Sequence, residues 1–210
     1  FTGWGAYGLE DKRFKYFGQA EYYWNKNPYR RLLVSYEENT YQPGLVISNI
    51  PPDHYLLSFR RTPSTNMFYE QTIKIQYDHE WFNGLTNTFE LNLKNISATR
   101  FNPLIHAVTN EVMPSITDNS FTLGTRFSLN ERFIQGDFKR EPIKTISPIF
   151  TLKLKYSDPV FGSDYQYGQV YLSIEKRFMP GIFGFTDVEI ETAKIFGKVP
   201  YPLLLIHRGN

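Results

Sequence analysis

The longest stretch of alternating apolar and polar residues sets the strongest constraint on this chain. Over residues 68–82, aromatic and aliphatic side chains alternate with polar and charged ones. A period of two residues is typical of a β-strand with one apolar and one polar face. Asn83 and Gly84 follow, a dipeptide typical of a two-residue hairpin turn, and residues 85–97 return with the same alternation. This segment predicts a hairpin of two long antiparallel strands.

The same alternation recurs along the chain and predicts an all-β, antiparallel fold of about nine strands. Aromatic residues make up 17% of the chain, and aromatic side chains favour strands. We expect residues 39–67 and 98–118 to be long connections, with a helical turn or a short strand at residues 55–59. The expected strands span residues 1–8, 14–24, 29–38, 68–82, 85–97, 119–134, 147–157, 165–178 and 184–196.

The lengths of these strands indicate a membrane protein. Most span about ten to fourteen residues, whereas strands of soluble proteins usually span about five or six. A strand tilted across a bilayer needs about nine to eleven residues, and no apolar run is long enough for a membrane helix. Long connections tend to fall at one end of the expected sheet, as in outer-membrane barrels. We therefore expect an antiparallel transmembrane β-barrel in a bacterial outer membrane.

The two faces of the expected strands suit lipid and a polar lumen. Charges of both signs occupy the polar series, and each would cost a few kcal/mol if it faced lipid. A large soluble β-sandwich is the alternative, but it would rarely contain so long a hairpin. Aromatic residues near strand ends are expected to form girdles at the two membrane interfaces. They are Tyr22, Trp24, Tyr36, Tyr69, Trp81, Phe82, Phe133 and Tyr156.

An odd number of strands predicts that residues 1–210 are one segment of a larger barrel domain. A single-chain bacterial barrel has an even number of strands, since no strand edge can face lipid. Phe1 lacks an initiator Met and a signal region, and residues 207–210 do not form an amphipathic strand with a terminal aromatic. We expect the remaining strands to lie largely after Asn210.

Three parts of the sequence together carry a resemblance: residues 5–8 with 11–16, residues 69–85, and above all residues 195–204, which read IFGKVPYPLL. They resemble a Bacteroidota family of outer-membrane proteins of unknown function. In that family a carboxypeptidase-regulatory-like domain precedes a C-terminal barrel related to the BamA and TamA superfamily. The resemblance covers most of the chain. It implies a barrel of about 16 strands, with a soluble domain upstream of this segment.

The resemblance also implies a candidate site. In that superfamily a long extracellular loop folds into the lumen and places an Arg-Gly motif against the inner wall. Arg208 and Gly209 are the candidate lumen-inserted loop here, and Glu189 and Glu191 on the last expected strand are its candidate lumen partners. Asn210 departs from the aromatic residue expected after that glycine. A solvated Arg208 is the alternative.

No motif in the sequence points to catalysis. Cysteine is absent, and the four histidines lack the spacing of metal ligands. Neither a GxSxG nucleophile elbow nor a phosphate-binding glycine loop occurs. We predict no catalytic, metal-binding or cofactor-binding residue and no cofactor. A formal net charge of +2 disfavours a nucleic-acid partner.

The expected function is that of a non-enzymatic outer-membrane β-barrel that assists the insertion or translocation of envelope proteins or lipids. This expectation rests on superfamily analogy. The alternative is a passive channel or a structural barrel subunit of a larger outer-membrane complex, and a third hypothesis is an outer-membrane lipid hydrolase. The expected partner is outer-membrane lipid, with other outer-membrane proteins or lipoproteins as further candidates.

Overall fold

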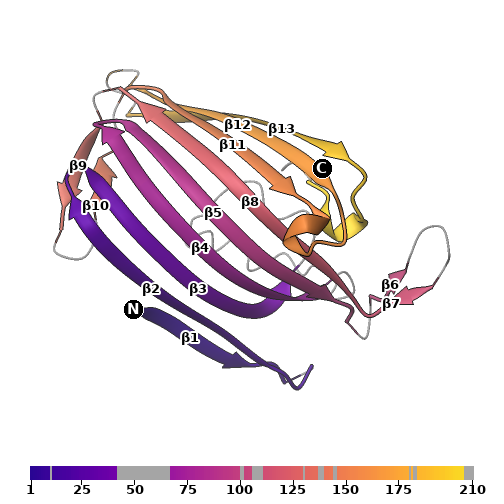
Figure 1. The fold of residues 1–210 in the computed structure, drawn as a ribbon. Coiled ribbons are helices and arrows are strands. Elements are labelled where there is room, and N and C mark those ends of the chain that lie inside the picture. Colours follow the sequence, from indigo (N-terminus) through magenta and orange to yellow (C-terminus); the bar gives the residue numbers. More distant parts are fainter. Residues whose placement is uncertain are drawn as a thin grey trace.

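One antiparallel sheet of nine strands dominates the computed structural model of the chain (Figure 1). Its order is β1-β2-β3-β4-β5-β8-β11-β12-β13, so the strands follow one another across the sheet as they do along the chain. The predicted all-β, antiparallel fold is confirmed. The structure describes residues 1–9, 11–41, 67–99, 102–105, 111–129, 131–136, 140–143, 146–179, 181 and 184–205.

Most strands of the sheet are long, and the register shifts at Trp24 on β2 and at Trp81 on β4. The strands of the sheet are β1 (Thr2–Tyr7), β2 (Phe14–Lys26), β3 (Tyr29–Tyr41), β4 (Phe68–Phe82), β5 (Leu85–Ser97), β8 (Ser115–Ser128), β11 (Ile149–Ser157), β12 (Tyr167–Phe178) and β13 (Thr186–Gly197). Two small ribbons pair β6 (Leu104–Ile105) with β7 (Val112–Met113) and β9 (Arg132–Gln135) with β10 (Arg140–Ile143). Among the elements that the structure describes are also the 3-10 turns η2 (Pro159–Phe161) and η4 (Tyr201–Leu203).

Several expected strands differ from the structure by one to three residues at an end, and one differs more. Residues 119–134 were expected to form a single strand, but β8 begins at Ser115 and ends at Ser128, and β9 belongs to a separate ribbon. The chain leaves the sheet where Glu131 folds back to bind Arg126, with Nη2 2.6 Å from Oε1. The short element expected at residues 55–59 lies outside the described residues.

The two ends of the sheet differ in their connections. At the turn end, β2 meets β3 and β4 meets β5 through tight turns. Gly84 has a φ of 99°, and its carbonyl oxygen accepts from the Ser128 amide at 2.8 Å, so the predicted Asn-Gly turn leaves no room for a Cβ. At the loop end, the chain passes from β3 to β4 and from β5 to β8 through long segments. The connection from β8 to β11, at the turn end, is also long.

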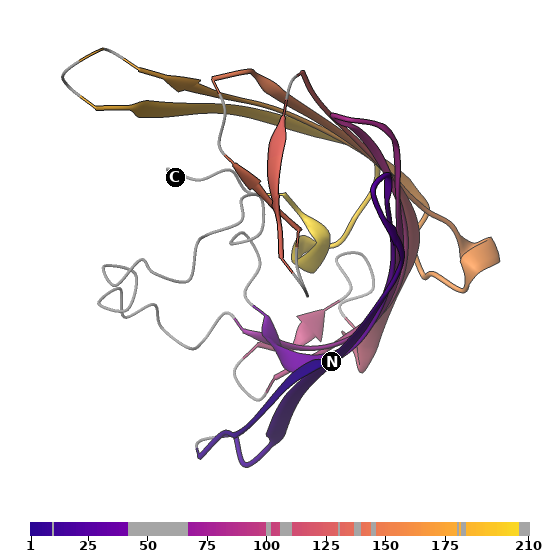
Figure 2. The same cartoon turned by 90° about the vertical axis from the view of Figure 1, so that its left-hand side faces the viewer.

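The sheet is bent into an open arc, with η4 on its concave side and η2 outside its convex side (Figure 2). Its strands are staggered. Register partners lead from Tyr22, near the turn end of β2, to Lys194, near the loop end of β13. The residues paired in succession are Tyr22, Leu32, Tyr77, Phe89, Leu123, Leu154, Val170 and Lys194.

The buried apolar core is small and lies at the loop end. Phe68, Ile96, Leu104 and Ile116 form one buried cluster, contributed by β4, β5, β6 and β8. Leu203 of η4 packs against this cluster from the other end of the chain. The core therefore anchors residues near the C-terminus to the sheet, while most of the large apolar side chains lie elsewhere.

Candidate functional site

The two faces of the sheet differ sharply in chemistry, as the alternation predicted. Lys74 on β4 and Lys153 on β11 face the concave side, where they line a cavity beside η4. The residues that alternate with them face the convex side and are mostly apolar. Many of these are exposed, including Val34, Ile73, Ile75, Phe89, Leu93, Phe121, Leu152, Leu154, Leu172 and Ile190.

The exposed apolar side chains form one continuous band. Ile75 is paired with Val34 on one side and with Leu91 on the other. Leu91 is paired with Phe121, and Phe121 with Tyr156. Cross-strand partners lie within contact distance of each other on one face of a sheet. The convex face therefore presents a connected apolar surface across β3, β4, β5, β8 and β11.

Charged side chains on the concave face pair across neighbouring strands. Arg31 on β3 is the centre of one network: its Nη2 lies 2.6 Å from Asp78 Oδ2, and its Nη1 lies 3.1 Å from Glu21 Oε2. Thr88 Oγ1 donates to the other oxygen of Asp78 at 2.8 Å. Asp78 is only 4% exposed, so these bonds compensate a buried charge.

A second network surrounds Asp118. Its carboxylate accepts from Lys155 Nζ and Tyr167 OH, both at 2.8 Å, and from Ser157 Oγ at 3.1 Å. Ser157 is fully buried and its hydroxyl also contacts Ser163 Oγ at 2.8 Å. A hydroxyl enclosed in this way has no path to a substrate. The network holds β8, β11 and β12 together and does not have the arrangement of a nucleophile and a base.

A cavity of about 380 Å³ lies between this charged face and the segment after β13. Its floor carries lysines and glutamates, and residues 202–205 form an apolar wall. Lys153 lies over the Tyr171 ring, with Nζ 5.4 Å from the ring centroid. Lys74 is paired with Glu90 at 3.6 Å, and Lys94 with Glu70 at 3.0 Å. The cavity thus combines cations, anions and aromatic rings on one polar floor.

The segment that follows β13 enters the concave side of the sheet (Figure 2). Pro202 is buried there, and its carbonyl oxygen accepts from Tyr41 OH at 3.4 Å. Arg208 and Gly209, the candidate loop residues themselves, lie outside the described residues.

The two candidate glutamate partners are both on the concave face of β13 but in different surroundings. Glu191 accepts a hydrogen bond from Tyr171 OH at 2.5 Å. Glu189 lies nearer the turn end, paired in register with Glu175, and lines a second cavity of about 230 Å³. The two glutamates thus lie two residues apart on the same face of β13, and their pairing with Arg208 stays a prediction.

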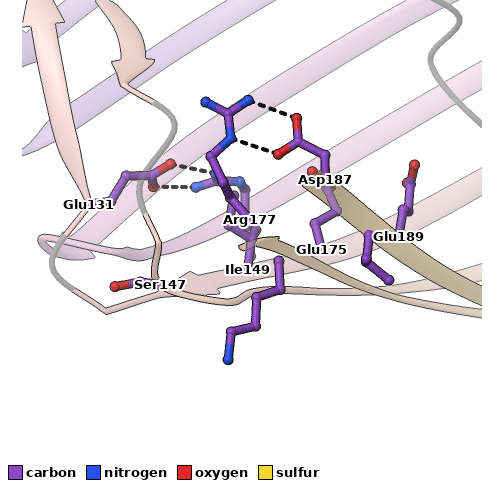
Figure 3. Close-up of a pocket in the computed structure, with 10 residues that line it drawn as sticks. Glu131, Ser147, Ile149, Glu175, Arg177, Asp187 and Glu189 are labelled. Atoms are coloured by element: carbon purple, nitrogen blue, oxygen red, sulfur yellow. Dashed lines mark hydrogen bonds and ion pairs between the residues drawn. The ribbon is translucent and has the colours of Figure 1, made fainter. Parts of the chain in front are cut away.

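The second cavity is a cluster of charges that the sequence reasoning missed (Figure 3). Arg177 binds Asp187 through two contacts, Nε to Oδ1 at 2.6 Å and Nη2 to Oδ2 at 2.7 Å. Arg126 binds Glu131 on the opposite wall. Arg177 and Asp187 are directly paired across the β12–β13 hairpin, so the register of that hairpin would have revealed them.

Within the described residues, no group of three or more His, Asp and Glu side chains is arranged to hold a metal ion. None of the helical segments in that part of the chain is both long and apolar enough to cross a membrane.

Comparison with known proteins gives a family but no function. The model of a family described as "Family of unknown function (DUF5686) C-terminal domain" matches residues 1–199. No curated protein and no solved structure was found to match the chain.

Proposed function

We propose that this chain, which belongs to the DUF5686 C-terminal domain family of unknown function, forms part of the wall of a transmembrane β-barrel in a bacterial outer membrane. The convex face contacts lipid and the concave face lines a polar lumen. The observation that carries the proposal is the continuous band of exposed apolar residues opposite a face of paired charges. This division is the one that lipid outside and water inside require.

The free energy of transferring apolar surface out of water supports a lipid environment for the convex face. Each square ångström of apolar surface moved out of water contributes about 25 cal/mol. Side chains such as Ile75 and Leu154, each about two-fifths exposed, would gain this contribution in lipid. Monomeric soluble proteins rarely expose so large a contiguous apolar surface.

Aromatic side chains border the apolar band near both ends of the sheet. Near the turn end, Trp24 contacts Tyr77 with ring centroids 5.9 Å apart, and Trp81 Nε1 donates to Asn87 at 2.7 Å. Near the loop end, the rings of Tyr16 and Tyr36 stack at 5.5 Å. Rings with a polar atom are typical of the two interfaces of a membrane. Trp24, Tyr36 and Trp81 are among the girdle residues expected from the sequence, whereas Phe133 of that set lies on β9, in a separate ribbon.

The stagger of the strands is also the kind that a barrel needs. Strands of a barrel are tilted, and their register shifts steadily around the wall. The paired residues that lead from Tyr22 at one end to Lys194 at the other shift in this way. Lys194 is on the convex face, but it lies near the loop end, where a lysine reaches the membrane surface. In lipid, the outer edges of β1 and β13 must be paired by further strands.

We propose a role in the insertion or translocation of envelope proteins or lipids, through a BamA- and TamA-like barrel of a Bacteroidota envelope. The support is the resemblance of residues 195–204 and the inward course of the segment after β13. The test is depletion of the protein in its native host, followed by quantitative proteomics of the outer membrane and a lipid-composition control. Broad loss of other barrels or surface proteins is the expected result. An unchanged outer-membrane proteome would contradict this role.

A passive channel is the second candidate, and the charged concave face favours it. Ion pairs such as Lys94 with Glu70 keep that face hydrated, which a conducting lumen requires. Conductance of the purified full-length protein in planar bilayers tests this candidate. Steady conductance together with an unchanged proteome in depleted cells would favour the channel over the biogenesis role.

A further inference from the structure

The turn between β11 and β12 displays two apolar side chains outside the sheet. Val160 is 88% exposed and Phe161 is 43% exposed, and both belong to η2. Figure 2 shows η2 standing clear of the convex side of the arc. A valine that is so exposed contributes little to packing, so its position is not explained by the stability of the fold.

The turn is held rigidly by its own hydrogen bonds. The Asp158 carboxylate accepts from the Val160 amide at 2.9 Å, from Tyr156 OH at 2.7 Å and from Gln166 Nε2 at 2.8 Å. Gly162 ends η2 with a φ of 77°, a left-handed conformation that glycine adopts without strain. The short turn is therefore fixed from both of its ends.

Further bonds tie the turn to β8. Asn119 Nδ2 donates to the Phe161 carbonyl oxygen at 2.8 Å. The Thr117 amide donates to Asp164 Oδ2 at 2.7 Å, and the Asp164 amide donates to the Thr117 carbonyl at 3.0 Å. Ordering of a loop is one of the costs of binding, and here the loop is ordered before any partner arrives.

The apolar band of the convex face leads directly to this turn. Tyr156 is paired with Phe121 in that band, while its hydroxyl binds Asp158 in the turn. A tyrosine with its ring against an apolar surface and its hydroxyl among polar groups is typical of a membrane interface. Tyr156 thus marks the level at which the lipid-facing surface ends, and η2 follows at that level.

We propose that Val160 and Phe161 insert into the boundary between headgroups and acyl chains and anchor the β11–β12 hairpin at a fixed depth in the bilayer. The proposal rests on the proposed contact of the convex face with lipid. A lipid surface fits better than a protein partner, because η2 consists of Pro159, Val160 and Phe161 and carries no charge. Of the two carboxylates in the turn, Asp158 accepts three hydrogen bonds within it, and Asp164 accepts from the Thr117 amide.

Single-cysteine labelling tests the anchor in the full-length protein. The 210 residues contain no cysteine, so Val160→Cys places one environment-sensitive fluorophore on the turn. Ile75→Cys on the convex band and Lys153→Cys on the concave face are the reference sites, and unsubstituted protein treated with the dye is the blank. Each labelled protein is reconstituted into phosphatidylcholine and phosphatidylglycerol vesicles. Quenchers are placed in the headgroup layer, deep in the acyl chains, or in the water.

We expect the label at residue 160 to emit at shorter wavelength in vesicles than in denaturant, and to be quenched most strongly from the headgroup layer. The label at residue 75 should be quenched most strongly from the acyl chains. If the label at residue 160 responds only to the aqueous quencher while that at residue 75 responds to lipid, the anchor is wrong and the lipid-facing wall stands. If the label at residue 75 also responds only to the aqueous quencher, the proposed wall itself is overturned.

Discussion

Arg31 and Asp78 face each other across β3 and β4, with two guanidinium nitrogens, Nε at 2.9 Å and Nη2 at 2.6 Å, on the same carboxylate oxygen. They are direct partners in the register of the two strands. The Asp78 side chain is 5% exposed and that of Arg31 is 20% exposed. The pair is therefore largely shielded from water, although it belongs to the charged concave face.

Asp78→Asn should destabilise the protein strongly, because it leaves the Arg31 charge without its closest partner. Removing one member of a buried pair costs about 3–5 kcal/mol, and the partial exposure of Arg31 reduces this to about 2–4 kcal/mol. The measurement is the free energy of unfolding by urea in detergent micelles. Lys74→Gln is the control, since the Lys74–Glu90 pair is longer at 3.6 Å and more exposed. It should cost no more than about 1 kcal/mol, and equal losses in the two variants would refute the argument.

Adjacent positions on β4 test which face meets lipid. Ile75→Arg places a charge in the middle of the apolar band and should cost about 2–4 kcal/mol of folding free energy in a bilayer. Gln76→Arg places the same charge on the concave face, where Gln76 already donates to Asp78 at 2.9 Å, and should be nearly neutral. Reversible unfolding of both variants in lipid vesicles supplies the comparison. A Gln76→Arg loss as large as that of Ile75→Arg would contradict the assignment of faces.

The segment after β13 offers a third test. Leu203 packs on the buried cluster that includes Phe68 and Ile96, so Leu203→Glu should release residues 198–205 from the concave face. Release should make the segment more sensitive to added protease, and it should raise the conductance in planar bilayers if the lumen conducts. Leu204→Glu is the matched control, because Leu204 is 42% exposed and is not part of that packing. Protease sensitivity that is equal in both variants would show that Leu203 does not anchor the segment.

The positions of strands could be predicted where apolar and polar residues alternate without a break. They could not be predicted where buried polar residues interrupt that alternation. Both strands of the hairpin at β4 and β5 have the bounds expected from the sequence. The start of β8 was missed because the buried Asp118 looks like a loop residue until Lys155 and Tyr167 are seen to surround its carboxylate. Such compensation depends on pairing between strands that are far apart in the sequence. The Arg177–Asp187 pair was missed for a different reason, because it depends on the exact register of the β12–β13 hairpin.

The turn at η2 gives a prediction for pH. The Val160 amide, together with the Tyr156 hydroxyl and Gln166, holds the pKa of the Asp158 carboxyl below its ordinary value of 3.8. A carboxyl whose pKa is lower in the folded state stabilises that state above the unfolded pKa, and the contribution is lost as the pH falls through the folded pKa. The turn should therefore stay ordered at neutral pH and loosen only at a pH below that at which a free aspartate titrates.

Emission from the fluorophore at residue 160 between about pH 2 and pH 6 in micelles follows this loosening. Asp158→Asn is the control, because an asparagine oxygen still accepts from the Val160 amide but carries no titrating proton. Its emission should be independent of pH over that range, whereas the protein with Asp158 should show a transition below the ordinary value. A transition of the same size and midpoint in both proteins would assign the change to other carboxyl groups and remove Asp158 as the support of the turn.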